Sequence, residues 1–293
     1  MKLALLVVAI SGTASAAPTR PLAIDGEAPY FGFVGAPARG HVIARQVLPA
    51  AAPADVAQSR TLYLNPNDVI LVPGDNDSVQ QTSSIVPEPV EMSGWSTDED
   101  TWDATVACVA DMYSRFDITV TDEDPGTTPH IEAVIGGYPA DVGLPDNVAG
   151  VSPFTEDCGI IEGSIVFTFA NALPNDAQTV CEIVSQELAH SFGLDHEMLP
   201  QDPMTYLDYD GDRTFQDATA SCGEFTERPC GINGSTCRAN QSSVQLLQQR
   251  VGKPATKQAP APADRAGGCS TGHDVGLLLV VALAGLRRRR LRE

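Results

Sequence analysis

The sequence predicts an α+β domain, and three observations support this class. The chain has 293 residues, which is long enough to bury a sizeable core. Two segments show helical spacing of apolar residues, at about 98–116 and from 175 to 193. Short apolar runs typical of strands surround them, at 61–64, 69–72, 118–121, 131–135 and 164–169.

The N-terminal residues predict export. Lys2 precedes an apolar run over 3–10 and the small-residue site at 14–16, so residues 1–16 are expected to be a signal peptide. Residues 17–59 are rich in Ala, Pro and Gly and contain short apolar pieces. They are either a propeptide or an extra strand-bearing extension. The first cysteine is Cys108, so a latency-enforcing segment must act through another ligand or by steric cover.

The helices have recognisable ends. Ser96 or Thr97 is expected to cap the helix at 98–116, which has an acidic first turn. Asn175 is expected to cap the next helix. Residues 136–161 are predicted to be loop-rich, the run at 164–169 is predicted to be a buried strand, and 241–251 is predicted to be a closing helix.

The second helix carries the most informative run, QELAHSFGLDH at 186–196. Gln186 and His190 lie one helical turn apart on the same face, so both side chains can reach one point. Gly193 permits the left-handed turn that ends a helix, which brings His196 back towards that point. With Glu187 beside it, this arrangement provides metal ligands and a base for a metal-activated water.

This run resembles the metzincin signature H-E-x-x-H-x-x-G-x-x-H, with Gln186 in place of the first histidine. Residues 202–206 look like the Met-turn that follows it. The resemblance implies a metzincin-like zincin domain over 60–251. Such a domain has a mixed twisted sheet, an active-site helix, the Met-turn and a small C-terminal subdomain. It also implies an edge strand that binds substrate antiparallel, near 164–169 or the loop before it.

The resemblance implies a secreted metal-dependent endopeptidase that cleaves protein or peptide substrates. Glu187 would be the general base, Met204 the floor beneath the metal, and Tyr206 either an oxyanion stabiliser or a buried structural tyrosine. The metal would be zinc, with copper possible because the amide of Gln186 is a weaker ligand than imidazole. Some algal gametolysin-like proteases carry glutamine here. The alternative is an inactive metzincin-fold module for binding or adhesion.

The C-terminal residues predict a second processing event. A Pro- and Ala-rich linker at 252–267 precedes Gly268 and Cys269, an apolar run at 275–286 and an arginine cluster. This resembles the sorting signal of myxobacterial surface proteins. It implies cleavage near Cys269 by a sortase-like protease, lipidation of Cys269 and placement on the outer membrane at the cell surface. An ordinary single-span anchor is the alternative.

The net charge restricts the possible partners, and the cysteines predict disulfides. The formal net charge of −20 argues against nucleic acid and anionic membranes as partners. The six cysteines other than Cys269 suggest up to three disulfides in an exported chain, with at least one closing the loop around Cys222, Cys230 and Cys237. The acidic turns at 74–78 and 208–212 are possible calcium sites, although solvated loops are favoured.

Overall fold

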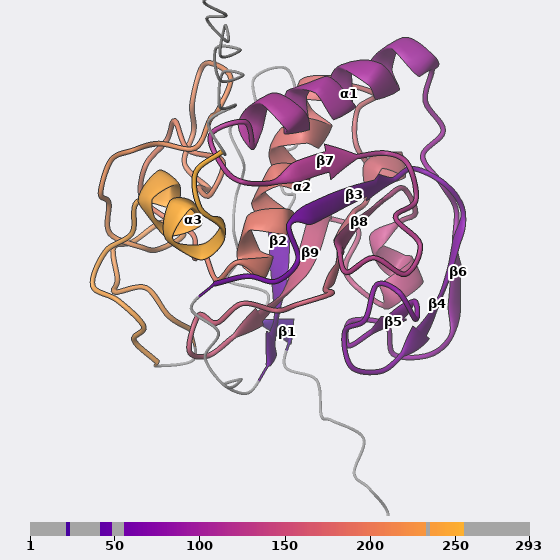
Figure 1. Ribbon diagram of the computed structural model, residues 1–293, viewed down its shortest axis with the longest axis horizontal. Helices are drawn as coiled ribbons and strands as arrows, with labels where there is room; N and C mark the ends of the chain where they lie inside the picture. Colours follow the sequence, from indigo (N-terminus) through magenta and orange to yellow (C-terminus); the bar gives the residue numbers. More distant parts are fainter. Residues whose placement is uncertain (1–21, 24–41, 49–55, 233–234, 255–293) are drawn as a thin grey trace, which may run out of the picture. The chain divides into compact units, whose positions relative to one another are not determined.

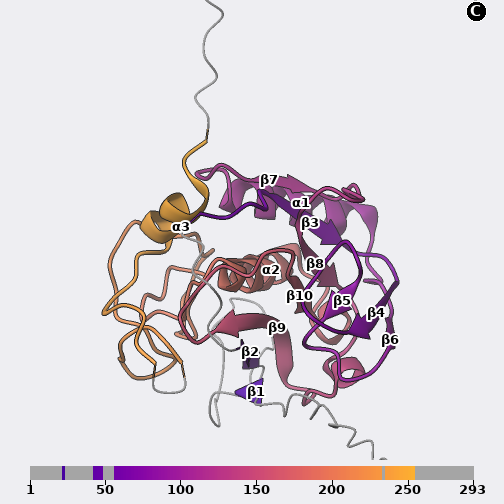
Figure 2. The same cartoon turned by 60° about the horizontal axis from the view of Figure 1, so that its bottom comes forward.

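The computed structural model describes residues 22–23, 42–48, 56–232 and 235–254. The signal peptide, Cys269 and the sorting segment therefore lie outside the described residues, as does much of 17–59. The largest element is a seven-stranded sheet with the order β1-β2-β9-β10-β8-β3-β7 (Figures 1 and 2). Its strands are β1 (Leu22–Ala23), β2 (Val42–Leu48), β3 (Thr61–Asn65), β7 (Thr119–Thr121), β8 (Ile131–Ile135), β9 (Val148–Thr155) and β10 (Ile165–Thr168).

The strand directions make this a mixed sheet. Strands β10, β8, β3 and β7 run parallel to one another, whereas β9 runs antiparallel to β10. Strand β2 then pairs parallel to β9 over its whole length, and the short β1 pairs antiparallel to β2. The fold is therefore α+β with a mixed, twisted sheet, as the sequence predicts.

Two helices pack against one face of the sheet, α1 (Glu99–Met112) and α2 (Ala177–Ser191) (Figure 1). Side chains of both helices share a core with the strands, including Val109 of α1, Leu188 of α2 and Leu62 of β3. A disulfide between Cys108 and Cys181 ties the two helices together. Burial of these apolar side chains is the main stabilising term, at about 25 cal/mol per Å² of apolar surface.

A smaller sheet covers part of the opposite face. It has the order β5-β4-β6 and comprises β4 (Val69–Pro73), β5 (Thr82–Ser83) and β6 (Val90–Met92). Leu71 and Met92 of this sheet share a second core with Phe167 of β10. Two short 3₁₀ helices complete this part of the chain: η1 (Pro139–Val142) precedes β9, and η2 (Ala170–Ala172) follows β10.

The segment after α2 contains one helix among the described residues, α3 (Ser243–Val251), and is otherwise held by isolated bridges and disulfides. Disulfides join Cys222 to Cys230 and Cys158 to Cys237. The prediction that one disulfide closes this loop is confirmed. Three disulfides indicate an oxidising or extracellular environment. Within the described ranges, no helix has the length and apolar character needed to cross a membrane.

One strand of the sheet was not predicted. The loop-rich residues 136–161 also contain β9. Gly150 and Pro153 obscure the strand, and every residue of β9 is buried, so no alternation of polar and apolar residues marks it. The predicted strand at 164–169 is present as β10, but it lies inside the sheet, because β9 and β2 follow it.

Helix ends also differ from prediction by a few residues. Asp98, rather than Ser96 or Thr97, caps α1 by accepting from the Thr101 amide, and α1 ends at Met112 instead of 116. Asp176 caps α2 instead of Asn175, because the Asn175 amide oxygen accepts from Thr97 Oγ1.

The closing helix is shorter than predicted. It begins at Ser243 rather than 241, after the cap Ser242. Gln241 lies outside the helix because its backbone amide and carbonyl pair with those of Ala220 in an isolated bridge.

Candidate metal centre

Helix α2 is buried along nearly its whole length, although it carries several polar residues. Some of these have structural partners: Glu182 pairs with Arg213 at 2.9 Å, and Ser191 bonds Ser164 at 2.7 Å. Gln186, Glu187 and His190 are buried on the same helix. Buried polar groups cost free energy unless a partner or ligand satisfies them, so their concentration marks a candidate functional site.

The end of α2 reverses the chain through a Schellman motif. The Gly193 amide donates to His190 O at 2.9 Å, and the Leu194 amide donates to Ala189 O at 3.3 Å. Gly193 has φ +77°, and a Cβ there would stand 2.1 Å from Cys158 O. Glycine is therefore required both for the backbone conformation and for the close approach of the Cys158 loop. The reversal is the one that the sequence predicted.

The reversal brings His190 and His196 together, with 3.1 Å between their Nε2 atoms. His190 Nδ1 lies 2.7 Å from Leu194 O, and His196 Nδ1 lies 3.1 Å from Glu224 Oε1. A carbonyl or carboxylate oxygen only accepts, so these contacts assign the proton of each neutral ring to Nδ1. Both Nε2 atoms then present lone pairs to the same point, where a shared cation would satisfy them.

Strand β9 forms one wall of this site. A Cβ built on Gly150 would stand 2.5 Å from Glu187 Oε1, so the Glu187 carboxylate lies directly against the strand. The ring of Phe154 contacts that of His190 edge-on, with centroids 5.8 Å apart. Glu187 and His190 are both fully buried. Glu187, the predicted base, and His190, a predicted ligand, therefore both face β9.

Three further predicted residues lie around the histidines. Gln186 is 1% exposed, and its Nε2 has no hydrogen-bond partner among the described residues. Tyr206 packs its ring on His196 with centroids 4.2 Å apart. Met204 is fully buried in the main core, and its carbonyl accepts from the Glu197 amide at 2.7 Å. The turn at 202–206 thus lies beside His196.

A carboxylate pair stabilises that turn. Asp202 accepts from the Met204 amide at 2.9 Å and from the Gln216 amide at 2.7 Å. Burial raises the pKa of Glu197 to about 10 and that of Asp202 to about 6, and the negative charge of Asp202 adds to the effect on Glu197. Two carboxylates hydrogen bond only when one is protonated, so the pair holds a proton at neutral pH.

No protein-family model and no curated protein matches this chain. A functional assignment therefore depends on the geometry of the site.

Two other groups of potential ligands in the described chain are chemically unsuited to a metal. Asp195 lies near Cys222 and Cys230, but both sulfurs are committed to a disulfide. Asp195 also lies near His196 and Glu224, yet Arg228 donates to both carboxylates, at 2.5 Å to Asp195 and 2.6 Å to Glu224. A guanidinium already supplies the positive charge there. The paired histidines remain the better metal site.

The loops predicted as possible calcium sites use their carboxylates differently. Asp77 Oδ1 accepts from the amides of Val79 and Gln80, closing its own turn. Neither this loop nor 208–212 contributes to the grouped metal-ligating side chains of the described ranges. Calcium at these loops stays a prediction.

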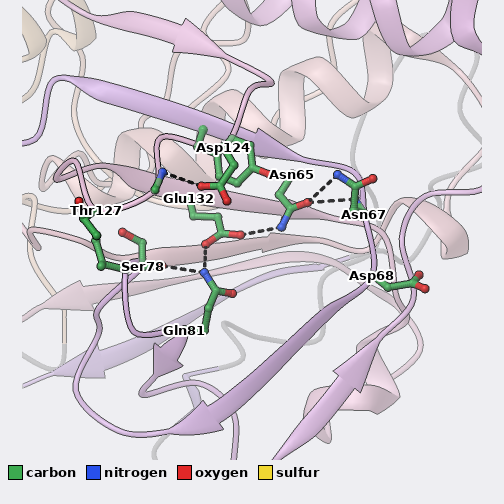
Figure 3. Close-up of a pocket in the computed structure, with 11 residues that line it drawn as sticks. Asn65, Asn67, Asp68, Ser78, Gln81, Asp124, Thr127 and Glu132 are labelled. Atoms are coloured by element: carbon green, nitrogen blue, oxygen red, sulfur yellow. Dashed lines mark hydrogen bonds between the residues drawn. The ribbon is translucent and has the colours of Figure 1, made fainter.

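A separate polar pocket of about 460 Å³ lies against β3 and β8 (Figure 3). At its base the buried Glu132 accepts from Asn65 Nδ2 and from Gln81 Nε2, both at 2.7 Å. Burial raises the pKa of Glu132. The lining includes neither histidine of the metal centre, and the amides already satisfy the carboxylate. This pocket is therefore distinct from the site on α2.

Sequence reasoning missed two residues of the site, Gly150 and Glu224. Gly150 lies in β9, a strand that was not predicted within the loop-rich stretch at 136–161. Glu224 is 28 residues from His196 and in a segment without regular periodicity. The one available signal was an acidic and a basic residue, Glu224 and Arg228, enclosed by Cys222 and Cys230.

Proposed function

We propose that this protein is a secreted metal-dependent endopeptidase of the metzincin type. The observation that carries the proposal is the convergence of two imidazole Nε2 atoms, 3.1 Å apart, with both Nδ1 atoms held by acceptors. Two nitrogen ligands about 2.0–2.1 Å from a tetrahedral ion would lie roughly 3.3 Å apart. Imidazoles in this arrangement suit zinc, and also copper.

The donor set fits a divalent metal. His190 and His196 would supply nitrogen, and Gln186 would supply its amide oxygen from the preceding turn of α2. Gln186 Nε2 has no protein partner in the described chain, so the amide is not committed to another role. When bound, the metal would polarise the scissile carbonyl and acidify a water molecule.

The chain's own residues would supply the remaining steps. Glu187 would take a proton from the water and later deliver it to the leaving amine. Gly150 and Phe154 of β9 would bound the site and exclude bulk water. Tyr206, packed on His196, would stabilise the oxyanion through its hydroxyl, and Met204 would support the site from the core.

The N-terminal extension would act as a propeptide. Strand β2 pairs with β9, and Ile43 is opposite Gly150, the residue that abuts Glu187. In metzincins the substrate adds a strand at this position, antiparallel to the edge strand. The parallel pairing of β2 would therefore occupy the substrate's position by steric cover, without a cysteine ligand, until the extension is removed.

A second candidate is an inactive binding or adhesion module on the same scaffold. Gln186 favours it, because a neutral amide is a weaker ligand than imidazole. Such a module would have the same fold and the same paired histidines as the peptidase. Processing near Cys269 and display at the cell surface would apply equally to both candidates, since those predictions depend on the sorting segment.

Metal analysis and proteolysis of the oxidised chain, without residues 17–59, would distinguish the candidates. We expect one zinc per chain and cleavage of casein, with cleavage abolished and zinc retained in Glu187→Gln. Gln186→His should bind zinc more tightly. Absence of both zinc and cleavage in the natural chain, with both gained in Gln186→His, would establish the inactive module.

A further inference from the structure

We propose that Glu224 is a positioning residue for the metal ligand His196, and that it acts from the loop closed by the Cys222–Cys230 disulfide. This inference rests on the proposed metal centre and assigns a role to a residue outside the signature. Glu224 Oε1 lies 3.1 Å from His196 Nδ1. The His196 side chain is fully buried, whereas that of Glu224 is 17% exposed.

The contact fixes the tautomer of His196. Because the carboxylate only accepts, it holds the ring proton on Nδ1 and leaves Nε2 unprotonated, facing His190 Nε2. A ring that was free to change tautomer would spend part of its time with a proton on Nε2, which excludes metal. The hydrogen bond from Nδ1 to Glu224 also raises the electron-donating strength of Nε2. This contribution matters more here because Gln186 supplies only a neutral amide.

Arg228 holds Glu224 in place. Its Nη2 donates to Glu224 Oε1 at 2.6 Å, and its guanidinium pairs with Asp195. Asp195 is fully buried and accepts from the His196 amide at 2.8 Å through Oδ1. The backbone of His196 and its ring are therefore fixed by the same charged network.

The loop closed by the Cys222–Cys230 disulfide also bonds to the backbone of His196. The Gly223 amide donates to His196 O at 3.0 Å, and Cys222 forms an isolated bridge with Glu197. Phe225, next to Glu224, contacts Tyr206 with ring centroids 5.8 Å apart. One short loop thus contacts both the third predicted ligand and the predicted oxyanion residue.

The test compares Glu224→Ala and Glu224→Gln in the full chain, with Glu227→Gln as the matched control. Glu227 is an exposed glutamate of the same loop. Zinc affinity is measured by competition with a chromogenic chelator. We expect a loss of about 10- to 100-fold in Glu224→Ala and a smaller loss in Glu224→Gln, whose amide oxygen still accepts from Nδ1. Glu227→Gln should match the natural chain.

Nitrogen-15 NMR of the His196 ring in the metal-free chain gives the second readout. We expect the Nδ1-protonated tautomer in the natural chain and a mixture of tautomers in Glu224→Ala. An unchanged tautomer and an unchanged zinc affinity in Glu224→Ala would overturn the proposal. The tautomer is measured without metal, so the role of Glu224 is tested even if the natural chain binds no zinc, a result that would instead refute the metallopeptidase.

Discussion

The carboxylate of Glu187 lies against Gly150 of β9, where a Cβ would be 2.5 Å from Glu187 Oε1 and 2.9 Å from Phe167 O. One contact is with the predicted base and the other is with the backbone of the next strand. Only glycine fits between them. The position of the base is therefore set by a residue that carries no side chain.

Gly150→Ala should displace Glu187 without removing a ligand. We expect peptidase activity to fall by about 100-fold or more, because small misplacements of a catalytic group are costly. Zinc content should be unchanged, and the free energy of unfolding should fall by about 1–3 kcal/mol. Cleavage of a fluorogenic peptide and zinc analysis measure the two effects. Gly211→Ala is the control, and full activity in Gly150→Ala would exclude this role.

Gly193→Ala should destabilise the chain more than an ordinary glycine substitution. The new Cβ would collide with Cys158 O, in addition to the cost of about 1–2 kcal/mol for a left-handed alanine. Urea denaturation should show a larger loss than in Gly126→Ala. Gly126 also has positive φ, at +59°, but its Cβ would meet no atom within 4 Å. Equal losses in the two variants would show that the collision is relieved.

Stability should depend on pH through Glu197. Burial raises the pKa of this group from 4.5 to about 10, so the folded chain retains a proton that the unfolded chain releases above pH 4.5. The contribution is complete below pH 4.5 and is lost as pH rises towards 10, by up to about 1.4 kcal/mol per pH unit. Glu197→Gln should flatten this dependence. Denaturation curves at pH 5, 7 and 9 provide the measurement, and parallel curves for both chains would contradict it.

Removal of residues 1–59 should increase peptidase activity, because it would leave the β9 edge open to substrate. Ala44→Pro is a milder form of the same change, since proline removes a backbone donor from β2. Initial cleavage rates are compared with those of the full chain, and thermal unfolding checks that the domain remains folded. Equal rates in all three chains would show that β2 does not cover the substrate position.

Much of the fold could be predicted because its signals are local. Strand β8 matches the predicted bounds, and β3 and β4 extend them by one residue. The turn at Gly193 follows from the freedom of glycine at positive φ. Strand β9 could not be predicted this way, because its burial comes from β10 on one side and β2 on the other, and β2 lies about a hundred residues earlier in the sequence.

The same distinction between local and long-range contacts applies to the candidate site. Gln186, Glu187 and His190 share one helix, and His196 follows a turn marked by glycine, so spacing alone grouped them. Glu224 reaches His196 only through the packing of a disulfide-closed loop, and nothing in its own neighbourhood indicates which histidine it meets. The spacing of apolar residues along the sequence does not reveal contacts between distant segments.

The Cys222–Cys230 bridge would make the proposed metal centre depend on the cellular compartment. Glu224 and Arg228 both lie within the eight-residue separation that this bridge spans. In a reducing cytoplasm the two cysteines would stay apart as thiols, and the loop that holds His196 would lose its closure. Assembly of the proposed centre would then follow oxidation of this bridge, so the centre would form only in an oxidising compartment.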